Sequence, residues 1–123
     1  MSLPVVLSDF LAAIEKRDVD AVSACFTADA TYAYAVPLPP LVGRDAIAAL
    51  FGPLLAQAES AAFEVVGYCV EGDRVWTERI DRFTFDGREV FIECAGVFDL
   101  ADGKISAVRD YVDMETWRSR KGS

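Results

Sequence analysis

Residues 75–85 read Val-Trp-Thr-Glu-Arg-Ile-Asp-Arg-Phe-Thr-Phe, and this stretch predicts a strand with a charged pair on its inner face. β-Branched and aromatic residues dominate it, which favours a β-strand. Side chains of a strand point alternately to its two faces, so Arg79 and Asp81 share one face. Their neighbours on that face are mainly apolar: Val75, Thr77, Phe83 and Phe85. Because a carboxylate among apolar side chains is costly unless it is paired, we expect Arg79 to contact Asp81.

A second charged stretch, Arg109-Asp110-Tyr111-Val112-Asp113, lies in a run near the C-terminus that also favours a strand. Alternation places Asp110 on one face with Val108, Val112 and Met114, and Arg109, Tyr111 and Asp113 on the other. If Asp110 faces the same core as Arg79, the arginine can touch both inward aspartates. The two stretches together therefore predict an acid, a base and a bridging cation.

Length and composition indicate a single domain over residues 1–123, large enough for a real core. The hydrophobic fraction of 53% and the aromatic fraction of 11% fit an apolar pocket, a buried oligomer interface, or simply a dense core. The net charge of −8 argues against nucleic acid and membrane partners, since both require a cationic surface. It fits a protein that handles a neutral or apolar small molecule.

The absence of histidine narrows the chemistry. It removes the commonest metal ligand, the usual partner of a nucleophilic serine and the usual proton shuttle, so acid–base work falls to carboxylates and tyrosines. Three cysteines, Cys25, Cys69 and Cys94, show no metal-ligand spacing. We expect buried free thiols in a reducing compartment and neither metal nor other cofactor. No signal peptide or membrane span is recognised, so a cytoplasmic location is expected.

The order of predicted elements is helices first and strands afterwards. An apolar stripe predicts a helix over residues 4–16, and Asp18 is placed to cap a short second helix. Residues 29–36 predict a strand that the prolines at 37–40 end. A third helix follows Gly43, and Gly52-Pro53 is expected to kink or break it.

Four further strands are predicted at residues 61–70, 74–85, 88–100 and 104–114, and the basic residues after them are expected to form a frayed tail. The links between these strands contain residues that tolerate positive φ: Gly72, Asp86-Gly87 and Asp102-Gly103. The strands should therefore form an antiparallel meander. Helices followed by a curved antiparallel or mixed sheet predict an α+β fold with helices covering one sheet face.

This order of elements resembles the cone-shaped domains of nuclear transport factor 2 and ketosteroid isomerase, in the SnoaL-like superfamily. Short motifs resemble limonene-1,2-epoxide hydrolase more specifically. Their joint order and spacing carry the resemblance from about residue 20 to 117. The motifs are Asp-Ala-Thr-Tyr at 29–32, Pro-Leu-Pro-Pro at 37–40, Gly-Arg-Asp-Ala at 43–46, Thr-Glu-Arg-Ile-Asp at 77–81, Gly-Val-Phe-Asp-Leu at 96–100, Gly-Lys-Ile at 103–105 and Arg-Asp-Tyr-Val-Asp at 109–113.

The resemblance implies a cofactor-independent epoxide hydrolase acting on a small apolar epoxide. Asp110 would be the general base, Asp81 the general acid, and Arg79 the bridge that orients both. Tyr32 matches the family's water-holding tyrosine. The family's water-holding asparagine has no clean match, and Tyr34, two positions after Tyr32, is the candidate to replace it.

Strand parity gives the expected pocket lining and the expected outer face. Phe83, Ile92, Cys94, Val108 and Val112 should surround the acids as substrate-binding side chains. Trp76, Ile80, Phe91 and Val97 alternate away from them and suggest a homodimer through that outer face.

Two other functions compete with hydrolysis. An isomerase or polyketide-type cyclase on the same fold would use one aspartate to move a proton next to a carbonyl. A non-catalytic module would keep the pocket only for binding. The pairing of two aspartates through one arginine favours the hydrolase.

Overall fold

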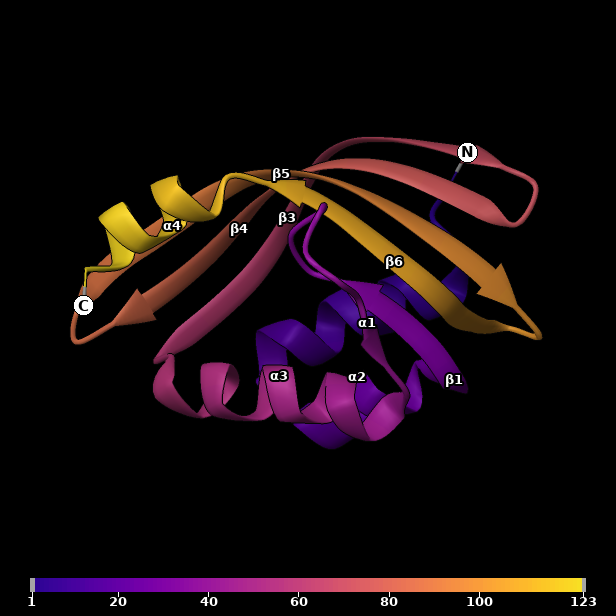
Figure 1. Cartoon of the computed structure of the whole chain (residues 1–123), viewed down its shortest axis with the longest axis horizontal. Helices are drawn as coiled ribbons and strands as arrows, with labels where there is room; N and C mark the ends of the chain where they lie inside the picture. Colours follow the sequence, from indigo (N-terminus) through magenta and orange to yellow (C-terminus); the bar gives the residue numbers. More distant parts are fainter. Residues whose placement is uncertain (1, 123) are drawn as a thin grey trace.

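The structure is a computed structural model that describes residues 2–122. A curved six-stranded sheet arches over three N-terminal helices, and a fourth helix lies at one end of the sheet (Figure 1). The strand order is β2-β1-β6-β5-β4-β3. Helices on one face of a largely antiparallel sheet confirm the predicted α+β fold.

The N-terminal helices form where the sequence predicted them. Helix α1 spans Val5–Lys16 and buries Leu7, Phe10, Ala13 and Ile14. Helix α2 spans Val19–Ala24, and the Asp18 side chain caps it by accepting from the Ala21 amide. Helix α3 spans Arg44–Gln57 and buries Ile47, Phe51 and Leu55.

The meander also matches the prediction closely. Strands β3 (Ser60–Glu71), β4 (Arg74–Phe85), β5 (Arg88–Ala101) and β6 (Lys104–Val112) pair antiparallel in sequence order. The β4–β5 and β5–β6 links each place an Asp-Gly pair at positive φ, namely Asp86-Gly87 and Asp102-Gly103. Tight turns with two left-handed residues suit the twist of the strands they join.

The N-terminal half joins this meander through one strand. Strand β1 (Phe26–Ala33) pairs parallel with β6, and the short β2 (Leu41–Val42) pairs antiparallel with the other side of β1. This makes β6 an inner strand, with β1 on one side and β5 on the other. The core lies between the sheet and α1–α3, where Phe10 contacts the rings of Phe26, Phe51, Phe63 and Phe98.

Helix α3 corrects the expected break at Gly52-Pro53, because it runs without interruption through Pro53. A proline inside a helix costs about 3 kcal/mol. The buried side chains on both sides of it, Phe51 and Leu55, are ones that a broken helix would expose. The boundaries of β1 also differ from the predicted 29–36, since the strand starts three residues earlier and ends at Ala33.

The C-terminal residues correct a second expectation. They form helix α4 (Met114–Lys121) instead of a frayed tail, and Asp113 caps it by accepting from the Glu115 amide. Arg120 anchors the helix by donating to the Phe91 carbonyl at 3.0 Å and to Glu93 at 2.7 Å. Of the three expected buried thiols, Cys25 and Cys94 are buried, whereas Cys69 is exposed.

Candidate active site

Arg79 lies between two buried aspartates. Its Nε and Nη2 atoms donate to the two oxygens of Asp81, each at 2.9 Å. Its Nη1 atom donates to Oδ1 of Asp110 at 3.1 Å. The exposed fractions are 1% for Arg79, 7% for Asp81 and 5% for Asp110. The structure thus brings together the three charged residues that the strand pattern placed on one face.

The sheet register explains how these residues meet. Arg79 and Asp81 are two positions apart on β4, so their side chains lie next to each other on the inner face. Asp110 lies on β6, with β5 between the two strands. Across the ladder, Arg79 is opposite Cys94 of β5, and Asp110 is opposite Gly96 of β5. Arg79 therefore reaches across a whole strand to contact Asp110.

Both predicted tyrosines lie at the same site. Tyr32 is buried on β1, and its hydroxyl donates to Oδ2 of Asp110 at 3.2 Å. The parallel pairing of β1 with β6 places it there, since Tyr32 is opposite Val108 in the register. Tyr34 follows just after β1 and lines the cavity that also contains Asp110. Tyr32 is thus placed to orient Asp110, and Tyr34 is a second tyrosine in the cavity wall.

Burial and neighbouring charges set the protonation of the site. Burial raises the pKa of Asp81, and the Arg79 guanidinium only partly offsets this, while Asp110 raises the pKa further. Burial opposes the charge of Arg79, but the two carboxylates outweigh it and hold the pKa of the guanidinium well above its usual value. Burial and the nearby Asp110 carboxylate raise the pKa of the Tyr32 phenol, which stays protonated.

Cys94 lies at the edge of this cluster. Arg79 Nη2 donates to its sulfur at 3.3 Å. Burial and the carboxylate of Asp110 raise the pKa of the thiol strongly. A neutral thiol is a poor nucleophile, so the environment of Cys94 fits a lining residue that does not react.

The acids open onto an apolar cavity of about 220 Å³. Four of the expected lining residues border it: Phe83, Ile92, Cys94 and Val112. Val108, the fifth expected lining residue, does not border the cavity, because this side chain is fully buried in the core. Its strand neighbours Tyr32 and Phe98 flank it on both sides. The alternation placed Val108 on the correct face but could not tell how deep on that face the cavity begins.

Other lining residues come from elements outside the two charged strands. They are Leu50, Phe51 and Leu54 of α3, Phe63 of β3, and Met114 and Trp117 of α4. Trp117 packs edge-on against Phe83, with ring centroids 5.5 Å apart. Met114 and Trp117 are the apolar residues of this mainly polar C-terminal stretch, and they were the signal in the sequence that it folds back on the core.

Two aromatic rings pack against the guanidinium of Arg79. The Arg79 Cζ atom lies 4.8 Å from the ring centre of Phe63 and 5.7 Å from that of Phe98. A cation over the face of an aromatic ring is attracted by the ring's electron density. These rings help to hold a buried arginine whose charge would otherwise be costly.

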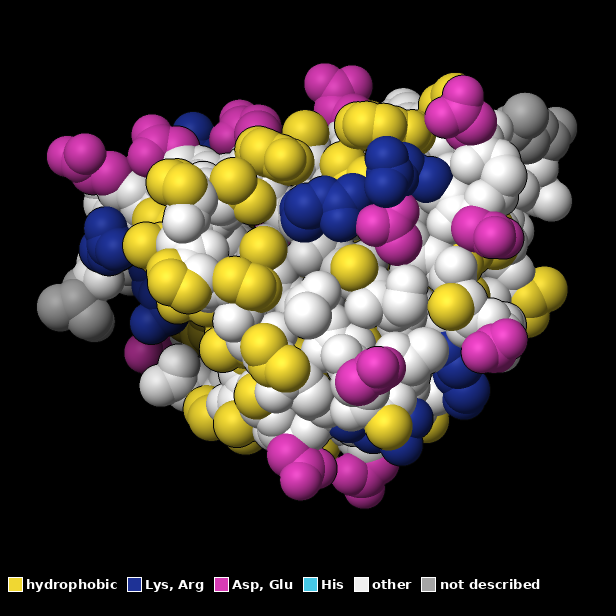
Figure 2. Space-filling view, turned by 45° about the vertical axis from the view of Figure 1, so that its right-hand side comes forward, with side chains coloured by type: hydrophobic (Ala, Val, Ile, Leu, Met, Phe, Trp, Pro, Cys, Tyr) yellow, Lys and Arg dark blue, Asp and Glu magenta, His cyan; other side chains and the backbone are white. Residues whose placement is uncertain are grey.

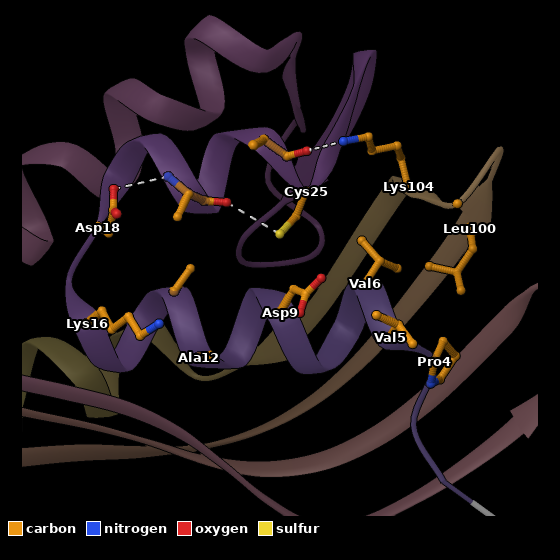
Figure 3. A pocket seen from close by; sticks show the side chains of 14 residues that line it. Pro4, Val5, Val6, Asp9, Ala12, Lys16, Asp18, Cys25, Leu100 and Lys104 are labelled. Atoms are coloured by element: carbon orange, nitrogen blue, oxygen red, sulfur yellow. Dashed lines mark hydrogen bonds between the residues drawn. The ribbon is translucent and has the colours of Figure 1, made fainter.

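A larger hollow of about 610 Å³ lies elsewhere, between α1, α2 and the tip of the β5–β6 hairpin (Figure 3). Three of its polar side chains have partners in or next to α2. Asp18 caps the helix, Cys25 donates to the Ala21 carbonyl, and Lys104 donates to the Ala24 carbonyl. These contacts stabilise the ends of α2, and the paired acids of the smaller cavity have no counterpart here.

The outer face of the sheet combines exposed aromatic side chains with paired charges. Trp76 and Tyr111 are 46% and 50% exposed. Arg82 pairs with Glu64 and Glu89, while Arg74 and Arg109 both pair with Asp99. On the side of the molecule shown in Figure 2, acidic side chains lie at several places along the edge, with hydrophobic and basic side chains between them.

The described residues, 2–122, contain no group of histidine, cysteine, aspartate and glutamate side chains arranged to hold a metal ion. Over the same residues, none of the helices has the length and apolar character needed to cross a membrane.

Comparison with known proteins gives both a family and a fold. The model of the SnoaL-like domain matches residues 7–108. An LEH-like epoxide hydrolase from M. tuberculosis has a TM-score of 0.80 and 26% sequence identity over 94% of this chain and 86% of that one.

Two further structures are similar at lower identity and bear on the fold alone. A protein of ketosteroid isomerase-like fold from Catenulispora acidiphila has a TM-score of 0.83 at 19% identity, over 97% of this chain and 93% of that one. A protein assigned to the polyketide cyclases, from Xanthomonas campestris, has a TM-score of 0.80 at 18% identity, over 96% and 95%.

Proposed function

The chain belongs to the SnoaL-like domain family, and on that premise we propose that it is an epoxide hydrolase that adds water to a small apolar epoxide. The observation that carries the proposal is Arg79 held between two buried aspartates at the end of an apolar cavity. The similarity to an LEH-like epoxide hydrolase at 26% identity supports the same reading.

Opening an epoxide with water needs two proton transfers. Asp110 takes a proton from water as the water oxygen attacks one carbon of the ring. The bond from that carbon to the ring oxygen breaks, and Asp81 gives its proton to that oxygen, so a diol forms. Asp110 is then protonated and Asp81 ionised, and one proton must move from the first to the second before the next turnover.

The environments of the two acids support this division of roles. The raised pKa of Asp81 favours the protonated form that a general acid needs. Tyr32 donates to Oδ2 of Asp110, and a water held by this oxygen and by Tyr32 or Tyr34 would face the cavity. The bridging Arg79 stays charged and fixes the orientation of both carboxyl groups.

The lining of the cavity supports a substrate with little polarity. Apart from the two aspartates, Cys94 and the two tyrosines, the lining side chains are aliphatic or aromatic, together with the thioether of Met114. A volume of about 220 Å³ is below the range of about 300–1,000 Å³ that is usual for drug-sized ligands. This points to a compact epoxide without charged groups.

A proton-moving isomerase or cyclase is the second candidate. The contact of Tyr32 with Asp110 favours it, since a base beside a hydroxyl donor suits proton transfer next to a carbonyl. The two hydrogen bonds from Arg79 to Asp81 favour the hydrolase. An isomerase has no need of a second acid bridged to its base.

A panel of small epoxides, both meso and terpenoid, tests the function. We expect saturable formation of diols and an unequal ratio of diol enantiomers. In one turnover in oxygen-18 water, the label should enter the diol directly and none should enter the protein. Label passing through an aspartate would replace the proposed water attack by a covalent mechanism, and turnover of a ketosteroid-type substrate alone would favour the second candidate.

We further propose that the protein is a cytoplasmic homodimer that buries the outer face of its sheet. This face carries the exposed side chains of Trp76 and Tyr111, and Tyr111 borders a hollow of about 360 Å³ together with Val66 and Ile80. The arginines of the face are already paired, so covering them leaves no cation without a partner. The three free thiols fit a reducing compartment.

A further inference from the structure

The contact between Arg79 and Asp110 crosses the inner face of β5. Arg79 lies on β4 and Asp110 on β6, and neighbouring strands in a sheet are about 4.7–4.9 Å apart. A side chain on the intervening strand would stand between the guanidinium and the carboxylate. The residue of β5 opposite Asp110 is Gly96, which is also opposite Thr77 of β4.

A side chain at position 96 has no room. A methyl group placed on Gly96 would lie 2.4 Å from Nη1 of Arg79 and 2.6 Å from Oδ1 of Asp110. These are the two atoms that form the contact between the residues. A third neighbour, Oγ1 of Thr77, would lie at 3.3 Å.

The backbone conformation does not require glycine here. The described glycines at positive φ are at positions 43, 72, 87, 103 and 122, and Gly96 is not among them. Glycine inside a strand weakens the strand and often marks a place where another group approaches closely. At Gly96 the approaching groups are the two charged side chains.

The surroundings leave the guanidinium little freedom to avoid an added methyl group. Phe63 and Phe98 cover Arg79 at 4.8 and 5.7 Å. Asp81 holds it by two hydrogen bonds. Thr77 of β4 donates to the Gly96 carbonyl at 3.0 Å, which ties this position of β5 to β4.

We propose that Gly96 is a positioning residue, whose missing side chain lets Arg79 hold the base Asp110 across β5. This inference rests on the proposed hydrolase function and deepens it. An added methyl group separates Arg79 from Asp110 and leaves the pair of Arg79 with Asp81, on β4 itself, in place. Gly96 thereby controls the orientation of one of the two acids.

The test is Gly96→Ala, with Gly67→Ala as the matched control. Gly67 lies on β3, and a methyl group there would meet only Oε1 of Glu78, at an ordinary distance of 4.0 Å. We expect Gly96→Ala to lower kcat on the order of 10²-fold, as a misplacement of about 1 Å does, with KM much less affected. Gly67→Ala should keep the wild-type kcat.

Two further measurements do not depend on hydrolysis. A crystal structure of Gly96→Ala should show the Arg79–Asp110 contact broken and the Arg79–Asp81 contact kept. The fall in melting temperature caused by Gly96→Ala should shrink in an Asp110→Ala background, because this change removes one of the two charged groups that conflict with the methyl group and frees the other, Nη1 of Arg79, from its partner across β5. If the single variant fails to fold, folding of this double variant supports the same conflict.

Three results would overturn the inference. They are an intact Arg79–Asp110 contact in Gly96→Ala, a loss of stability that is equal with and without the Asp110 carboxylate, and equal effects of Gly96→Ala and Gly67→Ala. If no epoxide is hydrolysed by the wild-type protein, the structure and the melting temperatures still decide whether Gly96 positions Asp110, so failure of the function and failure of the inference are separable.

Discussion

Arg79 donates to both oxygens of Asp81 but to only one oxygen of Asp110, whose second oxygen accepts from Tyr32. The two aspartates are therefore not equivalent, although both contact the same guanidinium. Asp81 is held rigidly by two parallel bonds. Asp110 has one oxygen for the arginine and one that it shares with a neutral hydroxyl, which suits a group that must also hold a water molecule.

Replacement of Asp110 by asparagine should remove the base and keep the shape of the site. We expect Asp110→Asn to lower the rate of epoxide hydrolysis about 10²–10⁴-fold, the usual contribution of a positioned base, with substrate affinity largely kept. Single-turnover kinetics and calorimetric binding of a diol measure the two quantities. Asp113→Asn is the control, because Asp113 only caps α4. An unchanged rate in Asp110→Asn would mean that another group accepts the proton.

Hydrolysis should fall as the pH rises through the pKa of Asp81. Burial and Asp110 raise this pKa above its usual 3.8, against the opposing effect of Arg79. Only the protonated form can give a proton to the ring oxygen, so kcat should have a descending limb toward high pH. Asp81→Asn should lose most of the activity at every pH. A kcat that does not change as the pH rises from acidic to alkaline values would exclude Asp81 as the acid.

The same proton should link the stability of the fold to pH. The folded chain holds the proton of Asp81 more tightly than the unfolded chain does, because the folded pKa is the higher one. This contribution is complete below the unfolded pKa and is lost as the pH rises through the folded pKa. Urea unfolding should show it as a pH-dependent difference in unfolding free energy between wild type and Asp81→Asn. A difference that does not vary with pH would contradict the shift.

A lysine at position 79 should not support hydrolysis as Arg79 does. An ammonium group is a point charge and cannot hold two carboxylates in a planar fork, so Arg79→Lys should lower hydrolysis by on the order of 10²-fold or more. Arg82→Lys is a matched control on the same strand, since Arg82 pairs with Glu64 and Glu89 on the outer face. Steady-state kinetics of both variants decide this, and equal effects would show that the fork geometry is unimportant.

Loss of the Tyr32 hydroxyl should cost less than loss of an acid. Tyr32→Phe removes one hydrogen bond to Asp110, which we expect to raise the barrier by about 1–3 kcal/mol. Comparison of kcat/KM between the variant and wild type gives the value. Tyr111→Phe on the outer face serves as the control. A loss as large as that of Asp110→Asn would assign Tyr32 a direct role in proton transfer.

A charge on the outer face of the sheet should prevent dimer formation. Trp76 is 46% exposed there, and a second copy packed on this face would bury it. Sedimentation of the wild-type protein should give a dimer at micromolar concentration and that of Trp76→Glu a monomer, with the fold of both checked by circular dichroism. A monomeric wild type would end the proposal of this interface.

Strand alternation accounts for what could be predicted of the site. Arg79, Asp81 and Asp110 are placed by a period of two residues, which depends only on local sequence. The meander was predictable for a similar reason, because Asp86-Gly87 and Asp102-Gly103 specify tight turns. Alternation could not predict which inward side chains border the cavity, because this depends on the curvature of the sheet. Val108, for example, is on the inner face but is buried in the core.

The largest omission was α4. Its sequence is mainly polar, so no apolar stripe marks it as a helix that packs on the core, and none of its residues is fully buried. Its position depends on contacts with distant strands, such as that of Arg120 with Phe91 and that of Trp117 with Phe83. The sequence also could not predict that α3 continues through Pro53, because tertiary packing decides whether the helix continues there.

The position of β6 between β1 and β5 has a consequence for synthesis of the chain on the ribosome. Until β6 has emerged, β1 and β5 each have an open edge with unpaired backbone donors and acceptors. Such edges are sites of aggregation. The nascent chain therefore exposes these two edges until β6 has been translated. Asp110, which completes the charged cluster, lies on that same strand.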